Sequence, residues 1–166
     1  MPRDGPPKAQ AKTNVARILE TLGIPHRVLA YDFDLEDLSA LTAASKIGLD
    51  ARLVYKTLAL RGERRGLFLC CVPAGAEVDL KKAAKAAAEK SVSMLPLAEL
   101  QAATGYLRGG CSPIGTKRAC GVLVDESARS LPEISISAGQ RGVQVVLAPA
   151  DLMRALGGRG EFAELA

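Results

Sequence analysis

The sequence predicts a single α+β domain in which helices surround a mixed, largely antiparallel sheet. Helix-like and strand-like segments are interspersed along the chain, with no internal repeat and no linker. Several neighbouring strand segments are joined by short turns of the kind found in hairpins, at 61–66 and 139–142. Such links argue against a doubly wound parallel sheet. With 166 residues, 48% of them apolar, the chain is long enough to bury one sizeable core.

The first part of the chain predicts a helix, a strand and a second helix. Thr13 can cap a helix whose apolar residues recur at spacings of three and four, and Gly23 can end it. We expect the residues before it, 1–12, to be a flexible tail and 13–166 to be the folded domain. The elements expected next are a strand at 25–31, an acidic loop at 32–37, and a helix at 38–47 that Gly48 ends.

The middle and last parts continue the alternation of strands and helices. Two apolar strands, 54–60 and 67–72, are joined as a hairpin. Asp79 can cap a helix, and Pro96 suits the first turn of another. The elements expected after the hairpin are a helix at 80–88, a short strand at 91–94, a short helix after 96, strands at 121–124, 134–137 and 143–147, and a helix at 150–156.

Composition and charge narrow the function classes. The formal net charge of +4 favours anionic partners only mildly. Cysteines stand at 70, 71, 111 and 120 without a C-x-x-C pair, and His26 is the one histidine, so we expect no zinc site. Free thiols are typical of a reducing cytoplasm. No apolar run is long enough to span a membrane, and no signal peptide is visible. We therefore expect a cytoplasmic protein.

The segment 105–115 predicts a shaped loop that lines a pocket. It holds four glycines, a serine and a proline, a composition that suits neither a helix nor an ordinary strand. Glycines let a backbone approach a ligand and direct its N–H groups at it. Cys111 within this loop is a candidate nucleophile, although no histidine is near it in sequence. Walker and Rossmann patterns are missing, which argues against a nucleotide site.

Lys56 is a second candidate, because it interrupts the apolar strand 54–60. Three interpretations are open: an ordinary solvent-facing lysine, a cation in a pocket that neutralises a phosphate or holds a carbonyl oxygen, and a Schiff-base lysine. Other basic residues are candidates for contact with an RNA backbone or, alternatively, form solvated faces. They are Lys81, Lys82 and Lys85 on one expected helix, and Arg108, Lys117 and Arg118 around the glycine loop.

These motifs together resemble a known family. Val54-Tyr55-Lys56-Thr57, followed by G-Y-L-x-G-G-x-S-P-x-G at 105–115, is similar to the YbaK family of free-standing aminoacyl-tRNA deacylases. That family is related to the editing domain inserted in bacterial prolyl-tRNA synthetase. Tyr31, the segment 78–82 and the segment 137–142 add further matches, so the resemblance extends over about residues 13–156.

The resemblance implies a fold and an activity. The fold is a mixed sheet partly rolled into a barrel and surrounded by helices. The activity is removal of a wrong amino acid, typically cysteine, from tRNA(Pro), by a substrate-assisted route in which the substrate thiol attacks its own ester. The implied partners are aminoacyl-tRNA and prolyl-tRNA synthetase, with no membrane, no DNA, no metal and no cofactor.

The resemblance also implies roles for residues. The residues implied to be catalytic are Lys56, Gly109, Gly110 and Ser112. Those implied to bind substrate are Tyr31, Thr57, Cys111, Pro113, Gly115, Gly139 and Gln144. Gln144 stands where better-studied members carry an acidic residue, and Gln140 replaces a more usual lysine. The alternatives left open are an alanine-removing deacylase, a non-catalytic module that binds tRNA or a synthetase, and a small-molecule esterase.

Overall fold

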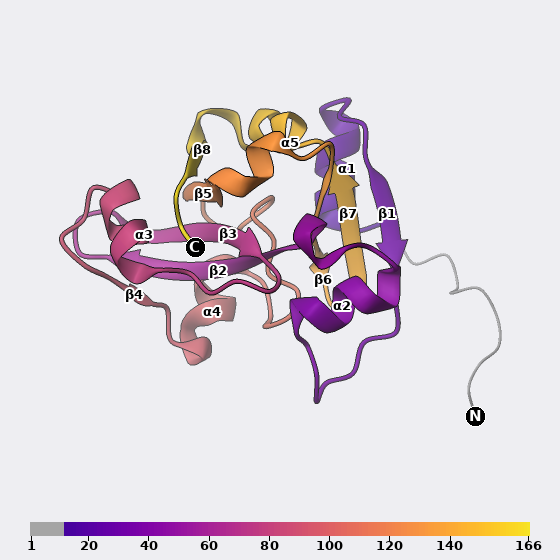
Figure 1. Cartoon of the computed structure of the whole chain (residues 1–166), viewed down its shortest axis with the longest axis horizontal. Helices are drawn as coiled ribbons and strands as arrows, with labels where there is room; N and C mark the ends of the chain where they lie inside the picture. Colours follow the sequence, from indigo (N-terminus) through magenta and orange to yellow (C-terminus); the bar gives the residue numbers. More distant parts are fainter. Residues whose placement is uncertain (1–11) are drawn as a thin grey trace.

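The computed structural model describes residues 12–166 (Figure 1). Nearly all of the expected tail, 1–12, therefore lies outside the described residues. The elements are α1 (Asn14–Thr21), β1 (Arg27–Ala30), α2 (Ala40–Ile47), β2 (Tyr55–Gly62), β3 (Gly66–Pro73), α3 (Leu80–Ala86), β4 (Val92–Met94), α4 (Leu97–Thr104), β5 (Gly121–Asp125), β6 (Ile134–Gln140), β7 (Val143–Leu147), α5 (Pro149–Leu156) and β8 (Gly160–Ala163). Three short 3-10 turns join them at Ala51–Leu53, Glu126–Ser130 and Gly157–Arg159.

The larger sheet has five strands in the order β4-β2-β3-β5-β8. The hairpin of β2 and β3 is antiparallel, as predicted, and β4 pairs antiparallel with β2. The pairs β3–β5 and β5–β8 are parallel, which makes the sheet mixed. Strand β8 was not predicted, because its four residues follow two glycines and carry no alternating pattern.

The smaller sheet has three antiparallel strands in the order β1-β7-β6. A single parallel bridge between Val54 and Ser135 connects it to the larger sheet, just before β2 begins. The mixed α+β architecture is confirmed. The expected partial barrel is not, because the described strands form two separate sheets and neither one closes.

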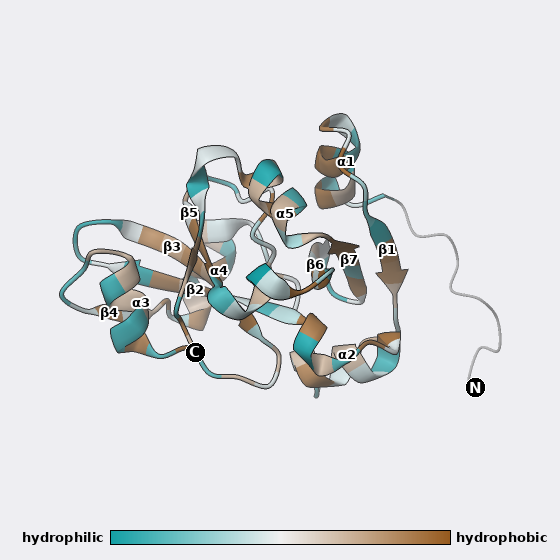
Figure 2. Cartoon of the chain, turned by 45° about the horizontal axis from the view of Figure 1, so that its top comes forward, coloured by the Kyte–Doolittle hydropathy of each residue, from teal (hydrophilic) through white to brown (hydrophobic). Residues whose placement is uncertain are grey.

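Two apolar clusters hold these layers together. The larger lies between the sheets and includes Leu69, Ile136 and Val145, while the second packs α3 against Phe68 and Leu123 of the larger sheet. Figure 2 shows the corresponding hydrophobic stretches along β3 and β7. The helix caps agree with the sequence: Thr13 accepts the N–H of Ala16 at α1. The two clusters and the helix caps therefore support the sheets around β2.

Candidate active site

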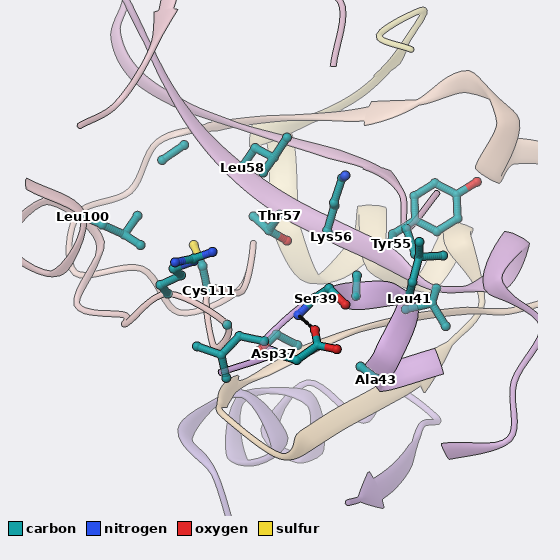
Figure 3. Close-up of a pocket in the computed structure, with 18 of the residues that line it drawn as sticks. Asp37, Ser39, Leu41, Ala43, Tyr55, Lys56, Thr57, Leu58, Leu100 and Cys111 are labelled. Carbon is teal, nitrogen blue, oxygen red and sulfur yellow. Dashed lines mark hydrogen bonds between the residues drawn. The ribbon is translucent and has the colours of Figure 1, made fainter. Parts of the chain in front are cut away.

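A cavity of about 650 Å³ lies beside β2, within the range of pockets that hold a whole small ligand. It opens where β4 stops, since β4 pairs with β2 only at its far end. In Figure 3, Lys56 and Thr57 follow β2 along one side of the cavity, and Cys111 of the glycine loop lies across from them. Asp37 and Leu41, from the loop before α2 and from α2 itself, form the remaining wall.

Lys56 is a cavity residue, as the resemblance implied. Its side chain is 23% exposed and lines the cavity, which favours the interpretation as a pocket cation. The ammonium Nζ lies 3.7 Å from Oε1 of Glu77, whose own side chain is almost fully exposed. Because the carboxylate is solvated, the pair is weak, and an anionic or carbonyl group in the cavity can compete for Lys56.

The glycine loop sits on the turn between β6 and β7. Gly105 ends α4 with φ 82° and Gly109 has φ 84°, conformations that other residues adopt at a cost. Gly110 is buried so closely that a Cβ there would come 3.1 Å from the backbone N of Arg141. The guanidinium Nε of Arg141 in turn donates to the carbonyl of Arg108 at 2.8 Å. The loop is therefore fixed in place by backbone contacts.

Two loop residues that line the cavity have backbone N–H groups without a hydrogen-bond partner among residues 12–166. The N–H of Gly110 donates to the carbonyl of Leu107 at 2.9 Å and is occupied. Among the hydrogen bonds between residues 12–166, none uses the N–H groups of Gly109, Cys111 or Ser112. Of these, Gly109 and Cys111 line the cavity. Ser112 is fully buried, and its hydroxyl accepts the N–H of Ile114 at 3.3 Å.

Cys111 lines the cavity, but its thiol is poorly suited to act as a nucleophile. Burial raises the pKa of the Cys111 thiol to about 12. Burial likewise raises the pKa of Cys71, the thiol of which lies 3.6 Å from the Thr57 hydroxyl, to about 12. Cys111 therefore stays protonated at neutral pH. Because the thiolate is the reactive form, this thiol is a poor nucleophile. The cysteines are free, as expected.

Tyr31 and Gln144 form a polar, uncharged part of the cavity lining. Tyr31 is half-buried, and burial raises the pKa of its phenol, against the opposing effect of hydrogen bonds from Gly142 and Gln144. The amide oxygen of Gln144 accepts the Ser135 hydroxyl at 2.8 Å, and both residues are buried. Ser135 could not be recognised from a sequence pattern, because its partner Gln144 lies on the neighbouring strand. At Gln144 the cavity lining is therefore an amide and not a carboxylate.

Residues 38–155, more than half of the chain, match the family model for the aminoacyl-tRNA editing domain. The chain belongs to this family. It is 39% identical over 158 residues to EbsC of Enterococcus faecalis, named as a Cys-tRNA(Pro)/Cys-tRNA(Cys) deacylase, with 95% of each chain covered. It is 27% identical to the uncharacterised YwhH of Bacillus subtilis, over 73% of this chain and 76% of that one.

Solved structures agree with this assignment to the editing family. A crystal structure described as a trans-editing enzyme for prolyl-tRNA synthetase matches with a TM-score of 0.78 and 26% identity, covering 93% of this chain and 98% of that chain. The hypothetical protein APE2540 has the same fold, with a TM-score of 0.81, 19% identity, and 91% and 97% coverage. The family resemblance inferred from the sequence is confirmed, and with it the activity class of an aminoacyl-tRNA deacylase.

Several residues predicted from the editing family lie behind the cavity wall. Gly110, Ser112, Pro113, Gly115 and Gly139 are outside its lining. A Cβ at Gly139 would come 2.8 Å from the ring of Tyr106, and one at Gly115 would come 2.9 Å from its hydroxyl. That hydroxyl donates to the carbonyl of Ile114 at 2.5 Å. These glycines accommodate Tyr106, which holds the loop from beneath and which sequence reasoning did not assign.

The predicted RNA-contact residues of this editing domain are exposed, but only one of them lines the cavity. Arg108 does so. Lys81, Lys82 and Lys85 are exposed on α3, which begins three residues after the cavity residue Glu77. Lys82 donates to the carbonyl of Ala166 at 2.7 Å. Lys117 and Arg118 are exposed beyond the glycine loop.

Within residues 12–166, no three His, Cys, Asp or Glu side chains come together as ligands for a metal ion. In the same part of the chain, no helix has the length and apolar character needed to cross a bilayer.

Proposed function

We propose that the protein hydrolyses the ester linking a wrong amino acid, cysteine first, to tRNA(Pro). One observation carries the proposal: Lys56 and the free amides of Gly109 and Cys111 share one cavity. The names of two relatives support the substrate, since one is named for Cys-tRNA(Pro) and the other for prolyl-tRNA synthetase.

The chemistry fits an ester that is already activated. Such a substrate needs positioning and stabilisation of the developing oxyanion more than a strong protein nucleophile. The amides of Gly109 and Cys111 supply donors, and Lys56 supplies positive charge, to the acyl carbonyl or to a ribose or phosphate oxygen. Buried Cys111 remains a thiol and takes no covalent part.

A cysteinyl ester supplies its own nucleophile. Its sulfur forms a bond to the ester carbonyl carbon, the bond from that carbon to the ribose oxygen breaks, and the thiol proton passes to the ribose oxygen. Water then opens the resulting cyclic thioester. No residue of the protein has to form or break a covalent bond in this route, which agrees with the raised pKa of Cys111.

The rest of the proposal concerns tRNA and location. Residues 13–166 act as one editing domain in the cytoplasm, with prolyl-tRNA synthetase as the partner that supplies mischarged tRNA. Lys81, Lys82, Lys85, Lys117 and Arg118 contact the tRNA backbone outside the cavity, and Arg108 does so at its mouth. Ser112, Pro113, Gly115 and Gly139 maintain the loop, while Tyr31, Thr57 and Gln144 contact the substrate.

The test is a panel of charged tRNAs: Cys-tRNA(Pro), Ala-tRNA(Pro), Pro-tRNA(Pro) and Cys-tRNA(Cys). Cysteine ethyl ester serves as a small-molecule substrate beside them. We expect rapid loss of the ester from Cys-tRNA(Pro) and persistence of Pro-tRNA(Pro). Loss from Ala-tRNA(Pro) alone would transfer the assignment to alanine. Binding of tRNA without turnover would indicate a binding module, and equal rates on the ethyl ester would indicate a small-molecule esterase.

A further inference from the structure

One edge of β2 is free where it borders the cavity. On one side β2 pairs with β3 over its whole length. On the other side it pairs with β4 only from Leu60 to Gly62, and Val54 bridges to Ser135 of β6. Between these two contacts the strand has no ladder partner among residues 12–166. Thr57 lies in this gap and lines the cavity.

The pairing pattern shows which way the peptide groups of Thr57 point. The carbonyl of Val54 accepts the N–H of Ala74, so the groups of Val54 face the β3 side. The carbonyl of Ala59 accepts the N–H of Leu95, so the groups of Ala59 face the opposite side. Because successive residues of a strand alternate in this respect, Thr57 shares the side of Ala59.

The side chain of Thr57 supports this orientation. Thr57 is opposite Cys71 in the hairpin, and their side chains approach to 3.6 Å, as expected for a pair that exchanges no backbone hydrogen bonds. The N–H and C=O of Thr57 therefore point away from β3, into the cavity. On that side Thr57 belongs to no ladder formed by the described strands.

A strand edge of this kind has a defined complement. One residue of an added antiparallel strand presents an N–H and a C=O from the same residue to the edge, and both are bonded. An α-aminoacyl ester carries the same two groups in the same order, an ammonium on Cα and a carbonyl on the next carbon. The edge peptide of Thr57 is thus matched to the part that all α-aminoacyl esters share.

We propose that the main chain of Thr57 binds the aminoacyl group as if it were one residue of an added strand. The C=O of Thr57 accepts from the α-ammonium, and the N–H of Thr57 donates to the ester carbonyl. This inference rests on the proposed function. It assigns recognition of the α-amino acid to the backbone of β2, and leaves choice among side chains to the remaining walls.

Carboxylates at the cavity are less suited to the ammonium. Glu77 and Glu36 also line the cavity, but both are exposed to solvent, and Glu77 faces the cation of Lys56. Asp37 is exposed, and its two oxygens already accept the N–H of Ser39 at 3.1 Å and the hydroxyl of Thr42 at 2.6 Å. The edge peptide, by contrast, has no ladder partner on this side among the described strands and belongs to a residue that lines the cavity.

A non-hydrolysable probe tests the contact directly. In the probe, cysteine is joined through an amide to 3′-amino-3′-deoxyadenosine; the matched control carries 3-mercaptopropionate, which lacks the ammonium. With ¹⁵N-labelled protein, we expect the cysteinyl probe to shift the Thr57 amide proton downfield and slow its exchange, and the control to bind at least tenfold more weakly. An unchanged Thr57 amide at saturating cysteinyl probe, or no binding of that probe, overturns the inference.

Two variants separate main-chain from side-chain recognition. Thr57→Val removes the hydroxyl and keeps the peptide group, and Asp37→Asn removes one competing charge from the cavity lining. We expect both to retain the tenfold preference for the cysteinyl probe over its control. Loss of that preference in Asp37→Asn would assign the ammonium to the carboxylate and refute the inference. Because binding of the probe needs no turnover, a protein that passes this test but deacylates no tRNA would refute the proposed function alone.

Discussion

The ammonium of Lys56 and the carboxylate of Glu77 lie 3.7 Å apart at the mouth of the cavity. Lys56 comes from the interior edge of β2, whereas Glu77 lies in the exposed loop that leads to α3. Solvent-exposed pairs of this kind contribute little to stability. The contact therefore orients the Lys56 side chain only weakly, and its charge remains available to a substrate.

Replacing Lys56 by alanine should lower deacylation of Cys-tRNA(Pro) at least about tenfold, as expected when one oxyanion- or phosphate-binding group is lost. Its side chain belongs to neither apolar cluster, so the thermal midpoint should change little. Lys90→Ala, at an exposed lysine outside the cavity, is the matched control. Turnover within twofold of wild type would remove Lys56 from the mechanism.

Cys111→Ser should retain substantial activity. The pKa of the Cys111 thiol is raised to about 12 by burial, so almost no thiolate exists at neutral pH and little nucleophilic capacity is lost. The measurement is kcat/KM for Cys-tRNA(Pro), together with modification by a thiol reagent in the folded protein, which should be slow. Complete inactivation with an intact fold would establish Cys111 as the nucleophile.

Gly110→Ala should disrupt the glycine loop. The added Cβ would lie 3.1 Å from the backbone N of Arg141 and 3.2 Å from the carbonyl carbon of Gln140, and neither backbone can move easily. Overpacking of this kind costs about 1–3 kcal/mol, and the displaced loop should also lower kcat. Gly158→Ala is the control, because nothing lies within 4 Å of its new Cβ. Equal denaturant midpoints for the two variants would contradict this.

Asp125 should contribute a pH-dependent part of the stability. Burial raises the pKa of its carboxyl, but hydrogen bonds from Ser127, Leu165 and Ala166 outweigh burial and hold it below the usual value. Since the folded pKa is lower than the unfolded one, the contribution is complete above the unfolded value of about 4. It is lost as the pH falls through the folded pKa.

Asp125→Asn tests this dependence. The variant should lose about 1–3 kcal/mol of unfolding free energy at pH 7, because buried N–H groups lose a charged acceptor. The difference from wild type, measured by urea unfolding, should shrink as the pH is lowered from 5 to about 3. Asp32→Asn, at an exposed aspartate, provides the comparison. A difference that stays constant with pH would contradict the expected titration.

Local signals in the sequence predicted most of the elements and part of the site. Thr13 and Asp79 cap the helices they were expected to cap. Lys56 was found because a charge interrupts an apolar strand. Tyr106 and Ser135 were missed because their partners, Gly139 and Gln144, are distant in sequence or on another strand, and a buried hydroxyl leaves no periodic pattern. The free edge at Thr57 exists because β4 pairs with β2 only from Leu60 to Gly62. The extent of this pairing cannot be predicted from the residues of either strand alone.

The pairing of β1 with β7 has a consequence for synthesis on the ribosome. Arg27 is paired with Val146, so β1, the first of the described strands, has no strand neighbour until β7, far along the chain, has been translated. The β2–β3 hairpin pairs locally and forms early. The β2–β3 hairpin should thus form while the nascent chain is still growing, and β1 should dock only after β7 has been made. Until that moment Tyr31 cannot take its place beside Gln144, and the cavity lacks this part of its lining.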